Sequence, residues 1–534
     1  MFIADFSGRS RLDACPGALQ VHAAADGGLA RVRVPGGRLT PFQLRELADA
    51  ASAYGGGVIE LTSRANVQVR GLGPESPDSG TGSGFAARMA EAGLLPSATH
   101  ERVRNILASP LTGLDGLTGL DVAGGTGGTG RTNHAGGGIA DVTPLIGELD
   151  RRLCARPALA ALPGRFMFAL DDGRGDVAGL GADAGILPTG PDEAALILAG
   201  TDSGLRVPLG GAVTALLAAA EAFLDELSTR DVTAWRISEL PDGPSLIAVR
   251  VRTALGISGT APFEPVRPRA ATLGPVGVVG SADVTGVGAG IEGNPGGGGR
   301  GGTGGGDARV ALGVAVPLGR LTSASARLLA DAASGGEIRL TPWRGVVLPG
   351  LDGAEVAGTA ARLEAAGLIV DPGSPWIGVT ACTGRPGCAK SLADVQADAA
   401  TAIGMAQPSA APPSGGRPPR GEPPEDRSSK SEPSKGEPPE VRSSRGEPSK
   451  DRSFRSEPSE GGPPVAPPSA IGPGTDTLPV HWAGCARRCG RPRGRVADVV
   501  ATGDGYRLEL DGTGLTCSGI EETAAAVAAA RGEL

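Results

Sequence analysis

Aromatic residues and lysine are scarce in this chain of 534 residues. Phe, Trp and Tyr together make up 3% of the sequence, and only four of the 50 basic residues are lysines. Because nearly all cationic side chains are arginines, an anionic ligand must be bound mainly by guanidinium groups. The net charge of −8 excludes the strongly basic composition that is typical of nucleic-acid-binding proteins.

Long apolar runs are also lacking. No apolar segment approaches the roughly 18 residues needed to cross a bilayer, so we expect no membrane association. The segment from Met1 to Asp5 does not resemble a secretory signal.

The four histidines are scattered along the chain, so we do not expect a histidine-based metal site. His481, close in sequence to Cys485, is expected at most to support the ligands of a metal site there and not to bind the metal itself.

Four of the seven cysteines form two closely spaced pairs. Five residues separate Cys382 from Cys388, three separate Cys485 from Cys489, and 96 lie between the pairs. Two pairs of thiolates fit a [4Fe-4S] cluster, in which each iron binds one cysteine sulfur. Structural zinc sites prefer about two to four residues within each pair, a limit that the first pair exceeds. Zinc, and buried or disulfide-bonded cysteines with no common role, are the alternatives.

Three cysteines, Cys15, Cys154 and Cys517, remain outside these pairs. An odd remainder beside an iron–sulfur motif favours a reducing compartment, so we expect a cytoplasmic protein.

The sequence contains an internal repeat. Residues 35–52 return as residues 317–334, with 12 identities in these 18 positions. In each copy we expect a strand, a helix and two further strands. Two such distant copies favour a pseudo-twofold enzyme with one site between its halves over a solenoid of repeats.

The helix of the first copy has a clear predicted start. Thr40 is a candidate N-cap with Pro41 at the first helical position. An apolar stripe with helical spacing follows at Leu44, Leu47, Ala48 and Ala51.

Between the two copies, helical and strand patterns alternate, which is typical of an α/β domain. We expect helices at 144–156 and 212–227 and strands at 165–170 and 194–198. The G-x-G-x-x-G match at 125–130 opens no helix and is not expected to bind a dinucleotide. Without an internal NAD or flavin domain, electrons should come from an external donor.

Two segments differ in composition from the rest of the chain. Residues 272–306 are rich in glycine and are predicted to be a linker. Residues 406–476 are rich in Pro, Ser and Glu with few apolar residues, and we expect them to be disordered.

The spacing of the cysteines resembles the cluster signature of the sirohaem sulfite and nitrite reductase superfamily. Within this superfamily, the N-terminal half is most similar to the precorrin-3B synthases of aerobic cobalamin biosynthesis. The similarity covers most of the chain outside the low-complexity segments. The segments that carry it are ACPG at 14–17, DGGLAR at 26–31, ELTSRANVQVRG at 60–71, VTA at 379–381 and HWAG at 481–484.

The resemblance implies an α+β fold, built as a pseudo-twofold enzyme with two ferredoxin-like half-domains and two α/β sulfite-reductase-like domains. We expect the half-domains at 10–75 and 307–372. The first α/β domain is expected at 95–240. The second, at 373–534, should bind the [4Fe-4S] cluster through Cys382, Cys388, Cys485 and Cys489.

Several arginines are implied as contacts of an anionic tetrapyrrole, because guanidinium groups suit bidentate carboxylate binding. Arg64 and Arg104 match two tetrapyrrole-binding arginines of the superfamily, and Arg344, beside Trp343, is a further candidate. The residues from Arg64 to Arg70 alternate between polar and apolar, which predicts polar side chains on one strand face. The polar residues are Arg64, Asn66, Gln68 and Arg70. The alternative is that they form a solvated sheet face with no ligand.

Residues 162–167 match the region where sulfite reductases hold their anionic substrate with two lysines. Here these positions are Arg165 and Met167. The loss of one cation should weaken sulfite reduction, because electrostatic stabilisation is usually the largest contribution to catalysis. Arg165 remains a candidate substrate contact.

The resemblance implies an O2-dependent monooxygenase that converts precorrin-3A to precorrin-3B by C20 hydroxylation and γ-lactone formation. Its partners would be precorrin-3A, O2 and an external donor, a ferredoxin or an NAD(P)H-linked reductase. The oxygen-activating metal would be a non-haem iron or a haem-type iron such as sirohaem, and no catalytic residue is assigned. The alternatives are an assimilatory sulfite or nitrite reductase with sirohaem, and a non-catalytic electron carrier or tetrapyrrole-binding protein.

Overall fold

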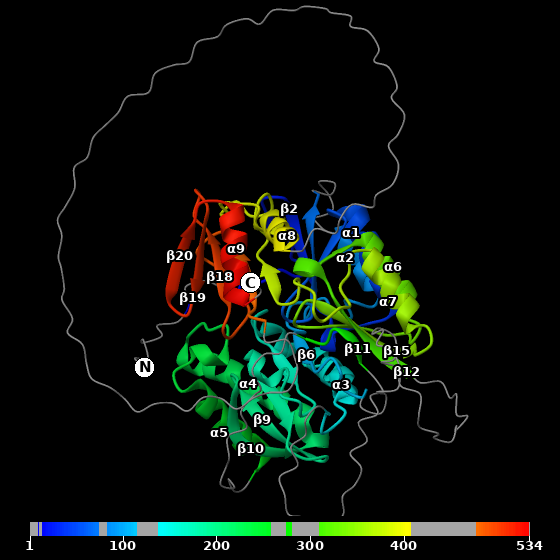
Figure 1. Ribbon diagram of the computed structural model, residues 1–534. Coiled ribbons are helices and arrows are strands. Elements are labelled where there is room, and N and C mark those ends of the chain that lie inside the picture. Colours follow the sequence, from blue (N-terminus) through cyan, green and yellow to red (C-terminus); the bar gives the residue numbers. More distant parts are fainter. Residues whose placement is uncertain are drawn as a thin grey trace, which may run out of the picture. The chain divides into compact units, whose positions relative to one another are not determined.

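The structure is a computed structural model that describes residues 9, 13–73, 83–114, 137–257, 274–279, 309–406 and 477–532. These residues form a mixed α and β fold with four five-stranded sheets (Figure 1). The glycine motif at 125–130 and nearly all of the segment predicted to be disordered lie outside the described residues. No helix within the described ranges is long and apolar enough to cross a membrane.

The first repeat forms an antiparallel sheet that packs on helix α1 (Pro41–Tyr54). As predicted, Thr40 caps this helix: its side chain accepts a hydrogen bond from the backbone of Gln43, whose side chain accepts one in return. The predicted apolar stripe is buried. The strands of the repeat, in sheet order, are β1 (His22–Ala24), β2 (Gly27–Val32), β5 (Val67–Leu72) and β4 (Val58–Leu61).

The second repeat forms a matching sheet. It packs with helices α6 (Ser323–Ala332) and α7 (Val356–Ala365). One strand, β11, lies within the segment 272–306, so this segment is not linker throughout. The strands, in sheet order, are β11 (Gly277–Val279), β12 (Arg309–Ala315), β15 (Gly345–Asp352) and β14 (Ile338–Leu340).

The two repeats exchange one strand each. Strand β3 (Arg38–Leu39) of the first repeat pairs with β14, and β13 (Arg320–Thr322) of the second repeat pairs with β4. The exchanged strands occupy equivalent positions in the repeat, so the exchange follows the pseudo-twofold relation. Helices α1 and α6 lie side by side (Figure 1), and one hydrophobic core spans both repeats. Each half therefore covers a sheet edge of the other.

Equivalent turns precede β5 and β15. Thr62 Oγ1 accepts a hydrogen bond from the backbone N–H of Asn66, and Thr341 Oγ1 accepts one from Gly345. The turns place Ala65 and Arg344 in the left-handed region, with φ of 53° and 60°.

The turn before β5 corrects the expectation of four polar side chains on one strand face. Because β5 begins only at Val67, Arg64 lies in the turn. Asn66 is buried just before the strand. Only Gln68 and Arg70 lie on β5 itself.

The first α/β region has three parallel strands followed by two antiparallel strands. The predicted helices at 144–156 and 212–227 are present as α3 (Thr143–Cys154) and α4 (Ala212–Arg230), with α5 (Gly243–Leu255) after them. The strand expected at 165–170 begins only at Phe168. In sheet order the strands are β6 (Ile106–Ala108), β7 (Phe168–Leu170), β8 (Ala184–Pro188), β9 (Glu193–Leu198) and β10 (Thr201–Pro208).

The second α/β region repeats this pattern of parallel and antiparallel strands. Helix α8 (Val395–Ala406) packs on β16 and β17, and α9 (Ile520–Arg531) packs beside it on β19 and β20 (Figure 1). In sheet order the strands are β16 (Val379–Ala381), β17 (Val480–Ala483), β18 (Ala497–Ala501), β19 (Tyr506–Leu510) and β20 (Thr513–Cys517). A short helix, α2 (Ser83–Glu91), packs against α1 in the first repeat.

Candidate functional site

The two cysteine pairs follow the carboxyl ends of neighbouring parallel strands. Cys382 comes directly after β16, and Cys485 comes two residues after β17. The strands pair with Ala381 opposite Trp482. The backbone N–H of Gly484 donates to Cys382 Sγ at 3.2 Å. Strand pairing therefore brings together two motifs that are far apart in the sequence, at the edge of the sheet where α/β proteins commonly place their sites.

The four thiols form neither a disulfide nor a close group of three or more sulfurs in the described part of the chain. None of the four is in a disulfide. Among the residues that the structure describes, no three of these sulfurs lie within 4.8 Å of one another. Four thiolates around one zinc ion would lie about 4 Å apart, given a Zn–S distance near 2.3 Å.

Burial raises the pKa of the Cys382 thiol, and the neighbouring Cys489 and Cys388 raise it further. Because a metal ligand must be a thiolate, binding of iron would have to displace this proton. Three of the thiols are half-buried and Cys489 is exposed.

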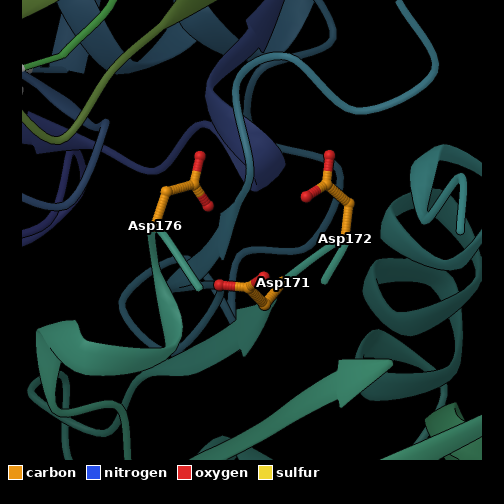
Figure 2. A group of neighbouring side chains, drawn as sticks. All are labelled: Asp171, Asp172 and Asp176. Atoms are coloured by element: carbon orange, nitrogen blue, oxygen red, sulfur yellow. The ribbon is translucent and has the colours of Figure 1, made fainter. Parts of the chain in front are cut away.

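A group of three aspartates follows β7, at the position that the second cysteine pair occupies after β17. Figure 2 shows Asp171, Asp172 and Asp176, whose nearest carboxylate oxygens lie within 4.8 Å of one another. The Asp171 carboxylate accepts four backbone hydrogen bonds of 2.8–3.0 Å from within the same loop. Burial, and then the charge of Asp171, raises the pKa of Asp176 to about 7. Because backbone N–H groups occupy both carboxylate oxygens of Asp171, this side chain stabilises its own loop with oxygens that a cation would otherwise bind.

One face of the first half-domain sheet is polar. Glu60, Gln68 and Arg31 lie opposite one another across β4, β5 and β2. Gln68 Nε2 donates to Glu60, and Arg31 Nη2 donates to Gln68 Oε1 at 2.9 Å. Arg31 and Arg33 also donate to Cys15 Sγ, at 3.3 and 3.4 Å. The opposite face packs on α1, so the sheet presents its cations away from the shared core.

Two of the arginines on this side of the sheet lack an acidic partner. The Arg64 guanidinium has no hydrogen bond or ion pair with any described residue, and burial, followed by the charge of Arg236, lowers its pKa to about 10. Arg33 is 1% exposed and donates only to two backbone carbonyl oxygens and to Cys15. Burial lowers the pKa of Arg33 to about 10 as well. Keeping these two buried guanidinium groups charged therefore costs free energy, and a bound anion would lower that cost.

Further arginines approach from other parts of the fold. Arg236 pairs with Asp183 at 3.2 Å, and burial raises the pKa of that carboxyl to about 6. Arg493, in the loop after Cys489, packs against Gly181 and lies within charge range of Arg236 and Asp183. We call the set formed by Arg31, Arg33, Arg64, Arg236 and Arg493 the arginine group.

Of the arginine group, only Arg64 was predicted from the sequence. The alternation of Arg31, on β2, and Arg33, directly after β2, with apolar residues was a signal for a shared face. Arg236 and Arg493 carry no such signal, because they join the group only through tertiary packing.

The side chains of Asn66 and Arg104 already have hydrogen-bonding partners within the protein. Asn66 accepts a hydrogen bond from the backbone of Val34 and donates to Asn105 Oδ1 at 3.1 Å. Arg104 forms a bidentate ion pair with Asp150, at 2.7 and 2.8 Å, and donates to the carbonyl of Leu94. Contacts of these two residues with a tetrapyrrole stay a prediction.

Arg165 and Met167 provide a single cation. Arg165 pairs with Asp13 at 3.2 Å and lies 4.4 Å from the ring centre of Trp235. Met167 is 3% exposed and packs with Ala169 and Ala182. A lysine at this position would have to bury its ammonium group.

Arg70 and Arg344 contact the loops that carry the cysteines. Arg70 Nη2 donates to the carbonyl of Gly387 at 2.6 Å, and Arg344 Nη2 donates to the carbonyl of Gly490 at 3.0 Å. His481 is buried beneath these loops, where its Nδ1 lies 2.9 Å from Thr380 Oγ1. Burial lowers the pKa of His481 to about 3, so the ring is neutral near pH 7.

Comparison with known families supports the repeat. The family model described as the nitrite/sulfite reductase ferredoxin-like half domain matches residues 22–76 and 303–366. These two ranges include the two copies of the internal repeat.

Two kinds of curated relative match short stretches. The chain is 39% identical over 88 residues to the ferredoxin–nitrite reductase of Leptolyngbya laminosa, covering 16% of each protein. It is 42% identical over 66 residues to the precorrin-3B synthase of a Sinorhizobium species, covering 12% of this chain and 14% of the relative. The matches therefore span about one seventh of the length of these relatives.

A solved structure matches over a much larger part of the chain. The NirA protein of Mycobacterium tuberculosis superposes with a TM-score of 0.55 and 18% identity, covering 91% of this chain and 77% of NirA. This likeness shows that the two proteins share a fold.

Proposed function

We propose that the chain is an oxidoreductase acting on a tetrapyrrole, because two of its segments match the nitrite/sulfite reductase ferredoxin-like half domain. The reaction proposed is that of precorrin-3B synthase. One oxygen atom of O2 enters precorrin-3A at C20, a γ-lactone forms, and the other oxygen atom leaves as water. An external donor supplies the electrons.

The arginine group is the observation that carries this proposal. The Arg64 guanidinium makes no hydrogen bond or ion pair with a described residue, and Arg33 makes no bond to a carboxylate. A precorrin carries many carboxylates, which would pair with these guanidinium groups through charge-assisted hydrogen bonds. An electron carrier without a tetrapyrrole would have no use for such a group.

Cys382, Cys388, Cys485 and Cys489 would hold a [4Fe-4S] cluster, which supplies one-electron transfer when bound. The cysteine loops bring this site close to the arginine group, because Arg493 lies four residues after Cys489. Arg31, Arg33 and Arg64 would orient the tetrapyrrole through its carboxylates.

A sulfite or nitrite reductase is the second candidate, because two of the curated relatives are ferredoxin–nitrite reductases. The burial of Met167 argues against sulfite reduction. That position matches one of two lysines in sulfite reductases, and here it offers no cation to polarise the anion.

The test is a parallel assay of the purified chain. One reaction contains precorrin-3A, O2 and a reduced donor, and the other contains sulfite or nitrite with the same donor and no O2. We expect oxygen-dependent conversion of precorrin-3A, measured by mass spectrometry with 18O2. Formation of sulfide or ammonia without precorrin turnover would favour the second candidate, and tightly bound sirohaem in the absorption spectrum would support it.

A further inference from the structure

Arg70 joins the first half-domain to the first cysteine loop. Its Nε and Nη2 atoms form a bidentate pair with Asp26, at 2.9 Å each. Nη2 also donates to the carbonyl of Gly387 at 2.6 Å. Gly387 immediately precedes Cys388, so this contact fixes the backbone next to a predicted cluster ligand.

Gly387 is closely enclosed by this pair. A Cβ atom there would lie 2.8 Å from Asp26 Oδ2 and 3.2 Å from Arg70 Nη2. The nearest atom would be Thr383 Cγ2 of the same loop, at 2.6 Å, so an alanine here would crowd its own loop as well as the Asp26–Arg70 pair.

Arg344 makes the corresponding contact from the second half-domain. Its Nη2 donates to the carbonyl of Gly490 at 3.0 Å, and Gly490 immediately follows Cys489. A Cβ atom on Gly490 would lie 2.9 Å from the same nitrogen. The two half-domains thus each send one arginine to a glycine carbonyl beside one cysteine pair.

We propose that Arg70 and Arg344 are positioning residues for the cluster ligands rather than contacts of the substrate. Each holds one cysteine loop against one half-domain, which sets the separation of the two pairs. This inference rests on the proposed [4Fe-4S] cluster and adds a role for the pseudo-twofold architecture in building its site.

The donors of Arg70 support this role over substrate binding. Nε and Nη2, the two atoms that form a bidentate fork, are both committed to Asp26, and Nη2 is shared with Gly387. A tetrapyrrole carboxylate would have to compete with Asp26, which already fills the fork.

Both arginines also place positive charge beside the cluster loops. Hydrogen bonding and net charge around an iron–sulfur cluster set its reduction potential. Reduction adds negative charge, so removal of either guanidinium should lower the potential and make reduction harder.

The test uses the full chain, purified and reconstituted without oxygen. In Arg70→Ala and Arg344→Ala, we expect the cluster absorbance to bleach about ten- to a hundredfold faster with EDTA and ferricyanide, since each variant loses a charge-assisted hydrogen bond. A redox titration should give a lower midpoint potential, with altered g values by EPR. Arg70→Lys and Arg344→Lys keep the charge and should lie between the alanine variants and the wild type.

The matched control is Arg45→Ala. Arg45 pairs with exposed Asp331 at 2.7 Å and contacts neither cysteine loop, so its cluster should match that of the wild type. If an alanine variant fails to fold, the lysine variants carry the test.

The outcomes separate this inference from the proposed function. If the wild type binds no cluster after reconstitution, both are overturned. If the wild type binds a cluster and all arginine variants keep its bleaching rate and potential, only the positioning role is overturned. Weakened tetrapyrrole binding in Arg70→Ala with an unchanged cluster would return Arg70 to the substrate site and also overturn this inference.

Discussion

The two α/β sheets share a topology but use it differently. In each, a loop follows the first parallel strand and another follows the second, at the same edge of the sheet. Counted from the strand ends, three positions correspond: Ser109 with Cys382, Asp172 with Cys485, and Asp176 with Cys489.

The chemistry at these corresponding positions differs. In the first sheet, Ser109 donates to Asp176 at 2.6 Å, and Asp172 pairs with Arg174, so the polar groups bind one another. In the second sheet, the thiols form no disulfides and line two separate loops. The strand order decides where such loops meet, whereas their side chains decide whether the loops are closed by internal bonds or can hold a cluster.

The largest effect is expected from a mutation in the cysteine loops of the second α/β sheet. Replacement of Cys485 by serine should abolish the intact [4Fe-4S] cluster, because one iron loses its thiolate ligand. Iron and sulfide analysis with EPR of the reduced protein measures this. Cys517→Ser, in β20 of the same sheet, is the control and should keep a full cluster. Full cluster content in Cys485→Ser would refute the ligand assignment.

The half-domains offer a second comparison, because Arg64 and Trp343 occupy equivalent turn positions. Arg64→Ala should weaken the binding of precorrin-3A by about ten- to a hundredfold, since a carboxylate loses a charge-assisted hydrogen bond. Fluorescence titration measures the Kd, and Arg45→Ala is the matched control. The cluster should remain. Unchanged affinity would remove Arg64 from the proposed substrate site.

The first sheet can be tested through the pH dependence of its stability. The pKa of Asp176 is about 7 in the fold, against an ordinary value of 3.8. Between these values the folded state binds more protons than the unfolded state. Its free energy of unfolding therefore falls as the pH rises from about 4 to 7.

Asp176→Asn cannot ionise and should remove this part of the pH dependence. Above pH 7 it should raise the free energy of unfolding by about 1–2 kcal/mol, because Asp176 is partly exposed and solvent screens part of the burial penalty. Urea denaturation at pH 5 and pH 8 measures the change. The same stability difference from wild type at both pH values would contradict the prediction.

The smallest effect is expected from the segment between the cysteine pairs. Removal of residues 412–467 should leave cluster content and soluble yield near those of the wild type, because loop closure depends only weakly on loop length. The pairing of β16 with β17 would still bring the two loops together. A loss of cluster in this deletion, measured by iron content, would show that the segment contributes to the site.

Local patterns in the sequence predicted the parts of the fold that depend on neighbouring residues. The Thr40 cap and the stripe of α1 were predictable because caps and helical faces are set within a few residues. The repeat predicted two equivalent halves, since similar sequences form similar units. The cysteine spacing likewise marked one candidate site, because each pair is a short motif whose members are close along the chain.

Tertiary structure decided the contacts that join distant segments. The exchange of β3 and β13 between the repeats and the ion pair of Arg104 with Asp150 depend on it. It also brings Arg236 toward Arg64 and Arg493 toward Arg236. An arginine side chain is long and can pair with any acceptor within reach, so its partner depends on which segments pack beside it. The sequence by itself determined which residues could bind a cluster or an anion, and packing determined which of them remain free to do so.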